Sequence, residues 1–207
     1  MKRIMIVCAL IMSSVAVTFA DSPLTSTHFC KIYNVSGGKT NYFPPYKIFD
    51  GEGWGNEVMD IICGSEYTLE QRLCLVNYVG WNFDGQTHYQ DLLDFYVKKN
   101  ALPSKPEAIK NMSGEMLIVF AYVKAMDDYF DVSAAKRLAK EAEKRSPNSR
   151  AVAMISALIQ SQAAMDTNWA DVYRVCHEVE LRTDLNNDFC DAAVWGIMEY
   201  INLYGAE

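Results

Sequence analysis

Histidine, cysteine and carboxylate side chains are the groups in this 207-residue chain that can carry out chemistry. The three histidines, His28, His88 and His177, fall on three different predicted elements, so their spacing predicts no metal site. The chain contains no C-x-x-C, H-E-x-x-H or G-x-S-x-G motif. We therefore predict no catalytic residue, no metal and no cofactor, and the sequence favours a non-catalytic protein over an enzyme.

Aromatic residues gather in and around residues 35–53, a segment rich in glycine and proline. Glycine permits positive φ angles and proline stops helices, so this segment is a predicted loop. A ligand site between residues 42–54 and the neighbouring helices would combine aromatic rings with a few polar groups. If that site is catalytic, His88 or Asp84 supplies the acid–base group. The candidate ligand-binding residues are Tyr42, Tyr46, Trp54, Trp81 and His88.

Two cysteines stand on neighbouring predicted helices of an antiparallel hairpin. Cys176 and Cys190 lie at heights that differ by ~5 Å when each helical residue rises about 1.5 Å. Both fall on predicted apolar faces, and disulfides form in an oxidising compartment. A disulfide between Cys176 and Cys190 is therefore one hypothesis, and two buried free thiols are the alternative.

Three aspartates, Asp127, Asp128 and Asp131, stand where two predicted helices meet. Only Asp127 and Asp131 would share a helix face, and a calcium-binding loop needs a denser set of oxygen ligands. We interpret the group as a solvated turn that includes a helix-capping carboxylate.

Residues 1–20 have the parts of a secretory signal peptide: a basic start, an apolar run over residues 4–17 and small residues before the end at Ala20. The apolar run is shorter than the ~20 residues that span a bilayer, so no membrane insertion is expected after its removal. We expect a bacterial protein in the periplasm or the medium. Its formal charge of −7 argues against nucleic acid and against anionic lipid as partners.

Residues 21–207 are predicted to form a single domain of consecutive helices. A short helix is expected over residues 27–33. Thr68 and Gln71 have the spacing of a capping box ahead of another helix. Residues 113–147 combine a helix that is apolar on nearly all sides with a helix that has one apolar stripe. Because no strand-like alternation flanks an Asn-Gly or Asp-Gly turn, the predicted fold class is all-α.

Three asparagines that precede predicted helices, Asn111, Asn148 and Asn186, are separated by 37 and 38 residues. A period of this length is typical of a helical-repeat array, in which stacked helix pairs bury each other's faces. The predicted repeat-like pairs occupy residues 113–207.

Ala135, Ala142 and Pro147 have the small–small–proline spacing of a tetratricopeptide repeat, and residues 116–204 resemble that family. The resemblance implies a short, irregular superhelical array of αα-hairpins. In the next unit Trp169 and Cys176 stand where small residues would be expected. The segments DSPLTST, AYVKAMDDYFDV and WADVYRV also resemble a family of secreted bacterial helical proteins, which implies the fold and the compartment but no activity.

Three functions are compatible with these patterns. The first is an exported helical-repeat protein that binds another protein or a peptide in a concave groove, with aromatic anchors on its inner helices. The second is a small-ligand binder or enzyme with its site between residues 42–54 and the helices. The third is an inhibitor or immunity-type protein whose acidic face meets a basic partner.

Overall fold

The computed structural model describes residues 22–31, 54–79 and 87–205. These residues form helices and no strand, so the predicted all-α fold class is confirmed. Within the same residues, no helix has both the length and the apolar character needed to cross a membrane. The predicted signal peptide, the loop over residues 35–53 and Trp81 lie outside the described residues. The helices are α2 (Pro23–Ser26), η1 (Phe29–Lys31), α4 (Asn56–Cys63), α5 (Leu69–Val79), α6 (His88–Lys99), α7 (Lys105–Asn111), α8 (Gly114–Asp127), α9 (Ser133–Arg145), α10 (Arg150–Ala164), α11 (Trp169–Glu180), α12 (Asp191–Ile201) and η2 (Asn202–Tyr204).

Short polar side chains start several of these helices. The predicted capping box is confirmed, because the Thr68 N–H donates to Gln71 Oε1 at 2.9 Å and the Gln71 N–H donates to Thr68 Oγ1 at 3.2 Å. Ser113 and Ser149 likewise accept backbone N–H groups at the starts of α8 and α10. Each contact satisfies a donor that has no partner within the helix, so these starts are determined locally.

Helix α8 is the centre of the fold and is buried on nearly all sides, as its apolar sequence predicts. It forms a hairpin with α9, whose buried face consists of the small residues Ala135, Ala139 and Ala142. The two helices approach so closely that a Cβ atom on Gly114 would lie 2.7 Å from the Ala142 carbonyl oxygen. Glycine at this position is therefore a packing requirement.

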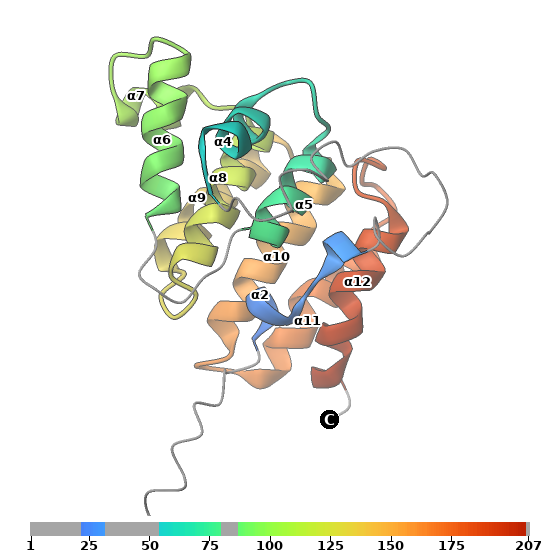
Figure 1. The fold of residues 1–207 in the computed structure, drawn as a ribbon. Helices are drawn as coiled ribbons and strands as arrows, with labels where there is room; N and C mark the ends of the chain where they lie inside the picture. Colours follow the sequence, from blue (N-terminus) through green and yellow to red (C-terminus); the bar gives the residue numbers. More distant parts are fainter. Residues whose placement is uncertain (1–21, 32–53, 80–86, 206–207) are drawn as a thin grey trace, which may run out of the picture.

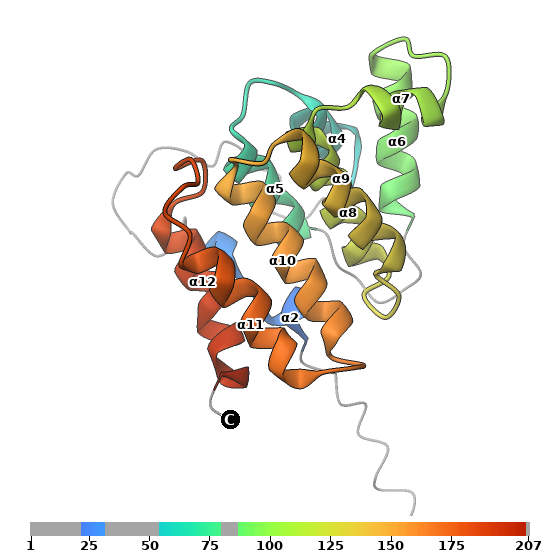
Figure 2. The ribbon, with the colours of Figure 1, turned by 180° about the vertical axis from the view of Figure 1, so that it is seen from behind.

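Helices α9, α10, α11 and α12 pack side by side in chain order, with α6 and α7 at the opposite end of the molecule (Figures 1 and 2). Where two of the helix junctions meet, the Asn186 N–H donates to the Asn148 carbonyl at 2.7 Å. Two of the three regularly spaced asparagines are therefore in direct contact. The assignment of the array to the tetratricopeptide family stays a prediction.

The N-terminal segment, residues 22–31, packs across α8, α10 and α12 (Figure 1). Within the predicted helix over residues 27–33, the described part holds a short 3₁₀ helix, η1, over Phe29–Lys31. The sequence analysis did not predict α2, which Ser22 caps ahead of it. Phe29 is fully buried between Tyr122 of α8 and Phe189, with ring centroids 6.3 and 5.4 Å away. Residues 22–31 therefore cover parts of α8, α10 and α12.

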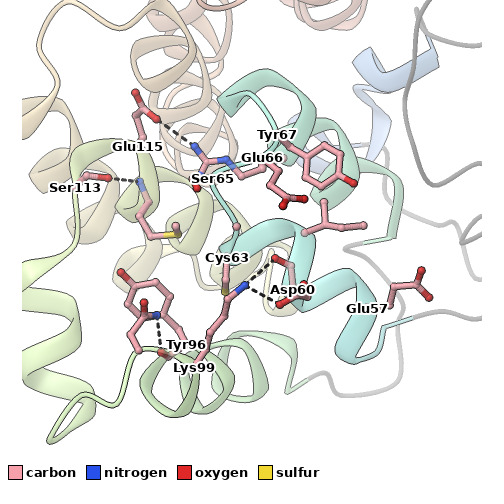
Figure 3. A pocket seen from close by; sticks show the side chains of 15 residues that line it. Glu57, Asp60, Cys63, Ser65, Glu66, Tyr67, Tyr96, Lys99, Ser113 and Glu115 are labelled. Atoms are coloured by element: carbon pink, nitrogen blue, oxygen red, sulfur yellow. Dashed lines mark hydrogen bonds and ion pairs between the residues drawn. The ribbon is translucent and has the colours of Figure 1, made fainter.

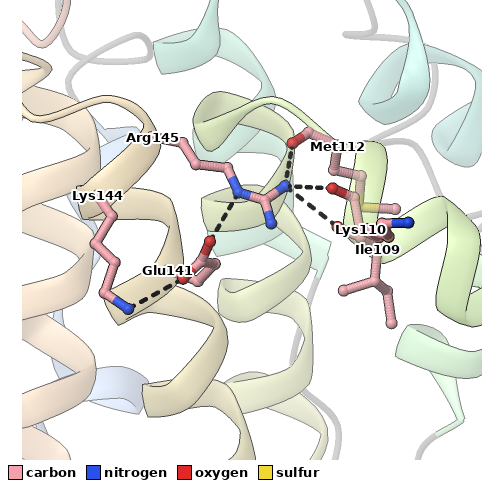
Figure 4. A network of polar contacts seen from close by, with 6 residues as sticks. All are labelled: Ile109, Lys110, Met112, Glu141, Lys144 and Arg145. Carbon is pink, nitrogen blue, oxygen red and sulfur yellow. Dashed lines mark hydrogen bonds and ion pairs between the residues drawn. The ribbon is translucent and has the colours of Figure 1, made fainter.

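Arg145, the last residue of α9, holds the end of α7 in place (Figure 4). Its Nη1 donates to the carbonyl oxygens of Ile109, Lys110 and Met112 at 3.3, 3.0 and 2.6 Å. Its Nε donates to Glu141 Oε1 at 3.0 Å, which orients the guanidinium. The last carbonyls of a helix have no partner within the helix, so Arg145 satisfies them from a neighbouring element.

Candidate functional site

The structure brings together two of the five candidate ligand-binding residues. Trp54 precedes α4 and His88 begins α6, and their rings stack with centroids 4.3 Å apart at an interplanar angle of 18°. Tyr42, Tyr46 and Trp81 lie outside the described residues, so a site formed by all five residues stays a prediction.

Asp127 joins this pair from the end of α8. The predicted solvated turn is wrong for Asp127, whose side chain is only 6 % exposed, with Oδ1 3.7 Å from His88 Nδ1. Asp127 Oδ2 accepts the Tyr89 N–H at 2.7 Å, and the expected cap residue, Thr87, instead contacts Asp91. Burial raises the pKa of the Asp127 carboxyl to about 6, although the N–H of Tyr89 and the charge of Lys124 act in the opposite direction.

The stacked pair and Asp127 connect α4, α6 and α8. The 3.7 Å separation of Asp127 Oδ1 and His88 Nδ1 is longer than a hydrogen bond. The other carboxylate oxygen is engaged by the start of α6. The arrangement of these three side chains is that of a junction between helices.

A polar pocket of about 720 Å³ lies among three parts of the chain (Figure 3). These parts are α4 and the loop that follows it, the end of α6, and the start of α8. Tyr67 and Tyr96 contribute aromatic rings to its wall, and Ser113 contributes a hydroxyl. Lys99 crosses from α6 to Asp60 of α4, with Nζ 2.6 Å from Oδ1. The pocket is therefore formed by residues that are distant in sequence.

Arg72 of α5 is the most deeply buried charged residue of this pocket. Its side chain is 6 % exposed, and its Nη2 donates to Glu115 Oε2 at 3.1 Å, the bond drawn to Glu115 in Figure 3. Arginine has five N–H donors, and Nε of Arg72 is buried with no partner among the described residues. Burial lowers the pKa of Arg72 and the charge of Glu115 raises it, but arginine remains protonated at neutral pH.

A second pocket of about 520 Å³ adjoins the first, and both are lined by Ser65, Tyr67, Arg72 and Glu115. It extends past the start of α5 to Asp188 and Cys190, ahead of α12. We call the two adjoining pockets the Arg72 cleft. The Arg72–Glu115 ion pair borders both of its halves.

The Arg72 cleft contains the thiols of Cys63 and Cys190. Cys63 is buried, and this burial raises its pKa to about 12. The thiolate is the reactive form of cysteine, so the Cys63 thiol is not activated at neutral pH. No histidine of the described residues lines the cleft, and these residues contain no cluster suited to hold a metal ion.

Cys176 and Cys190 are both free thiols in the structure, and a disulfide between them stays a prediction. Helix α12 begins at Asp191, so Cys190 is its N-cap residue and is partly buried against the core. The backbone N–H of Cys190 donates to Glu70 Oε2 of α5. Cys176 is buried with its Sγ 3.3 Å from Ser161 Oγ. The two side chains therefore have different neighbours.

The sequence analysis did not identify Arg72 or Glu115 as site residues. One signal was present, because Arg72 lies beside Leu73 and one turn from Leu69 and Val76, on the apolar face of α5. A cation in that position needs a partner from another element. Nothing in the sequence indicated that the partner is Glu115, 43 residues away.

Comparison with known proteins adds no family to these observations. No protein-family model matches the chain, and neither a curated protein nor a solved structure shows significant similarity to it. The functional argument therefore starts from the chemistry of the Arg72 cleft.

Proposed function

We propose that this protein is an exported, non-catalytic binding protein that holds a segment of another polypeptide in the Arg72 cleft. The observation that carries the proposal is the burial of Arg72 between two pockets, where its side chain has one hydrogen bond among the described residues, to Glu115. A buried cation with unused donors is unfavourable until an acceptor reaches it. The carbonyl groups of a bound peptide are such acceptors.

The other walls of the cleft suit a peptide backbone and its side chains. Tyr67 and Tyr96 offer rings that can anchor a partner's side chain, as aromatic residues do at many interfaces. Ser113 and Glu115 offer oxygen atoms that can accept backbone N–H groups. A peptide that crosses both pockets can use all of these groups at once, whereas a compact small molecule would occupy one pocket.

The inner face of the helical array is a less suitable place for a partner. Residues 22–31 already cover α8, α10 and α12 there, and Leu24 and Phe29 are buried in the core. Binding at that face would require the removal of these side chains from the core. The proposal therefore places the partner in the Arg72 cleft and not in the inner groove expected from the sequence.

A second candidate function is small-ligand binding beside Trp54 and His88. The observation that favours it is the stacked pair next to Asp127, whose pKa is raised to about 6 by burial. A ligand of this site would change the fluorescence of Trp54, whereas a peptide bound in the Arg72 cleft would leave it unchanged. Titration with Trp54→Phe as the reference separates these two functions.

The proposed function is tested by selecting peptides from a display library on the purified protein and measuring their affinity. Arg72→Met keeps an unbranched apolar stem and removes the guanidinium donors, and we expect it to weaken peptide binding at least about tenfold, equivalent to ~1.4 kcal/mol. Arg174→Met is the matched control, because Arg174 pairs with Asp171 and Glu178 on α11, outside the cleft. Equal affinities of wild type and folded Arg72→Met, or failure to select any peptide, would overturn the proposal.

A further inference from the structure

Negative charge predominates in the Arg72 cleft. Of the cations that line it, Arg72 pairs with Glu115 at 3.1 Å and Lys99 pairs with Asp60 at 2.6 Å. The carboxylates that line the two pockets are those of Glu57, Asp60, Glu66, Glu70, Glu115 and Asp188. Among the described residues, the one arginine and the one lysine of these walls are therefore already paired with carboxylates of the cleft.

Glu57 and Glu66 differ from the other carboxylates of the first pocket. Glu57 belongs to α4 and Glu66 to the loop that follows it, and both are exposed residues that line that pocket (Figure 3). Within the described part of the chain, no lysine or arginine forms an ion pair with either of them. Both carboxylates therefore border the pocket without a cationic partner among the described residues.

We propose that the segment bound in the Arg72 cleft carries lysine or arginine side chains that pair with Glu57 and Glu66. This inference rests on the proposed function, and it identifies the partner as a basic polypeptide. Arg72 takes a backbone carbonyl of the segment, while the cationic side chains extend to the exposed carboxylates. The two interactions use different parts of the ligand, so they can be separated by mutation.

The lining of the cleft favours an organic cation over a metal ion. The described residues contain no group of three histidine, cysteine or carboxylate side chains arranged to hold a metal. A lysine or arginine has a long apolar stem that can lie along the rings of Tyr67 and Tyr96 while its charge reaches the carboxylates. Opposite charges at exposed positions also accelerate association and make it sensitive to salt.

The probes are three pools of synthetic dodecapeptides that are random except at two positions, which are fixed as lysine, glutamine or glutamate. The variants are Glu57→Gln with Glu66→Gln and, as a matched control, Glu178→Gln with Glu199→Gln, which remove the same charge from α11 and α12. An exposed ion pair changes affinity about two- to fivefold, so two pairs give roughly tenfold. We therefore expect wild type and the control variant to bind the lysine pool roughly tenfold more tightly than the glutamine pool. The Glu57/Glu66 variant should bind the two pools equally well.

The possible results distinguish the two proposals. If the lysine and glutamine pools bind equally well and Arg72→Met weakens both, the proposed function stands and the requirement for a basic segment is overturned. If the preference for lysine persists in the Glu57/Glu66 variant, or falls equally in the control variant, the assignment to these two carboxylates is overturned. If no pool binds, the proposed function itself fails.

Discussion

Asp127, at the end of α8, accepts the backbone N–H of Tyr89, in the first turn of α6, at 2.7 Å. A carboxylate from one helix therefore caps the start of another helix. At most helix starts this role belongs to the N-cap residue, which in α6 is Thr87. The cap is buried beside His88, which in turn stacks on Trp54. These contacts connect α4, α6 and α8, and protonation of the Asp127 carboxyl there changes the free energy of unfolding.

The raised pKa of Asp127 predicts a pH-dependent stability that Asp127→Asn removes. Burial raises the pKa of the carboxyl to about 6 in the folded protein, against about 3.9 in an unfolded chain. The folded state therefore binds the proton more tightly, and stability falls as pH rises from about 4 to about 6. At ~1.4 kcal/mol per pKa unit, this contribution is at most about 3 kcal/mol.

The measurement is urea denaturation of wild type and Asp127→Asn between pH 4 and pH 7, because asparagine keeps a capping oxygen and has no charge. Asp171→Asn is the control with the opposite sign, since hydrogen bonding to Arg174 lowers the pKa of Asp171. Its contribution is present above the unfolded pKa and is lost as pH falls. Identical pH profiles for wild type and Asp127→Asn would contradict the prediction.

Phe29→Ala is expected to lower the free energy of unfolding by about 3–5 kcal/mol, because the side chain is fully buried in the core. The deletion leaves a cavity between Tyr122 and Phe189, whose rings both contact Phe29. Chemical denaturation measures the effect. The matched control is Phe130→Ala, since Phe130 is 76 % exposed and should change stability by no more than ~0.5 kcal/mol. Similar losses in both variants would show that residues 22–31 are not part of the core.

Arg145→Ala is expected to lower stability by about 1–2 kcal/mol and to loosen α7 locally. The change leaves the carbonyl oxygens of Ile109, Lys110 and Met112 without the guanidinium that they share. Hydrogen exchange over residues 105–112 should become faster, while the amides of α10 keep their protection. Arg137→Ala, on the exposed side of the same helix, is the control and should leave exchange in α7 unchanged. Unaltered exchange in α7 of Arg145→Ala would refute this role.

Local sequence signals were sufficient to predict the helices and several of their boundaries. The capping box of Thr68 and Gln71 and the hydroxyl of Ser113 satisfy backbone groups within three residues of themselves. Gly64 follows the last residue of α4, a position where glycine is common. These interactions depend on neighbours in the chain, so they can be recognised without knowledge of the packing. They determine the all-α fold class and the segmentation after residue 54.

Only the tertiary structure decided which side chains meet. Arg72 forms a hydrogen bond with Glu115, 43 residues away, and Asp127 forms one with Tyr89, 38 residues away. The apolar residues of α5 favour its burial but do not indicate which helix packs against it, since burial of apolar area has no directional preference. The composition of the Arg72 cleft and the burial of Phe29 against Tyr122 of α8 follow from that packing. The sequence by itself therefore determined the helices, and the packing of those helices determined the candidate site.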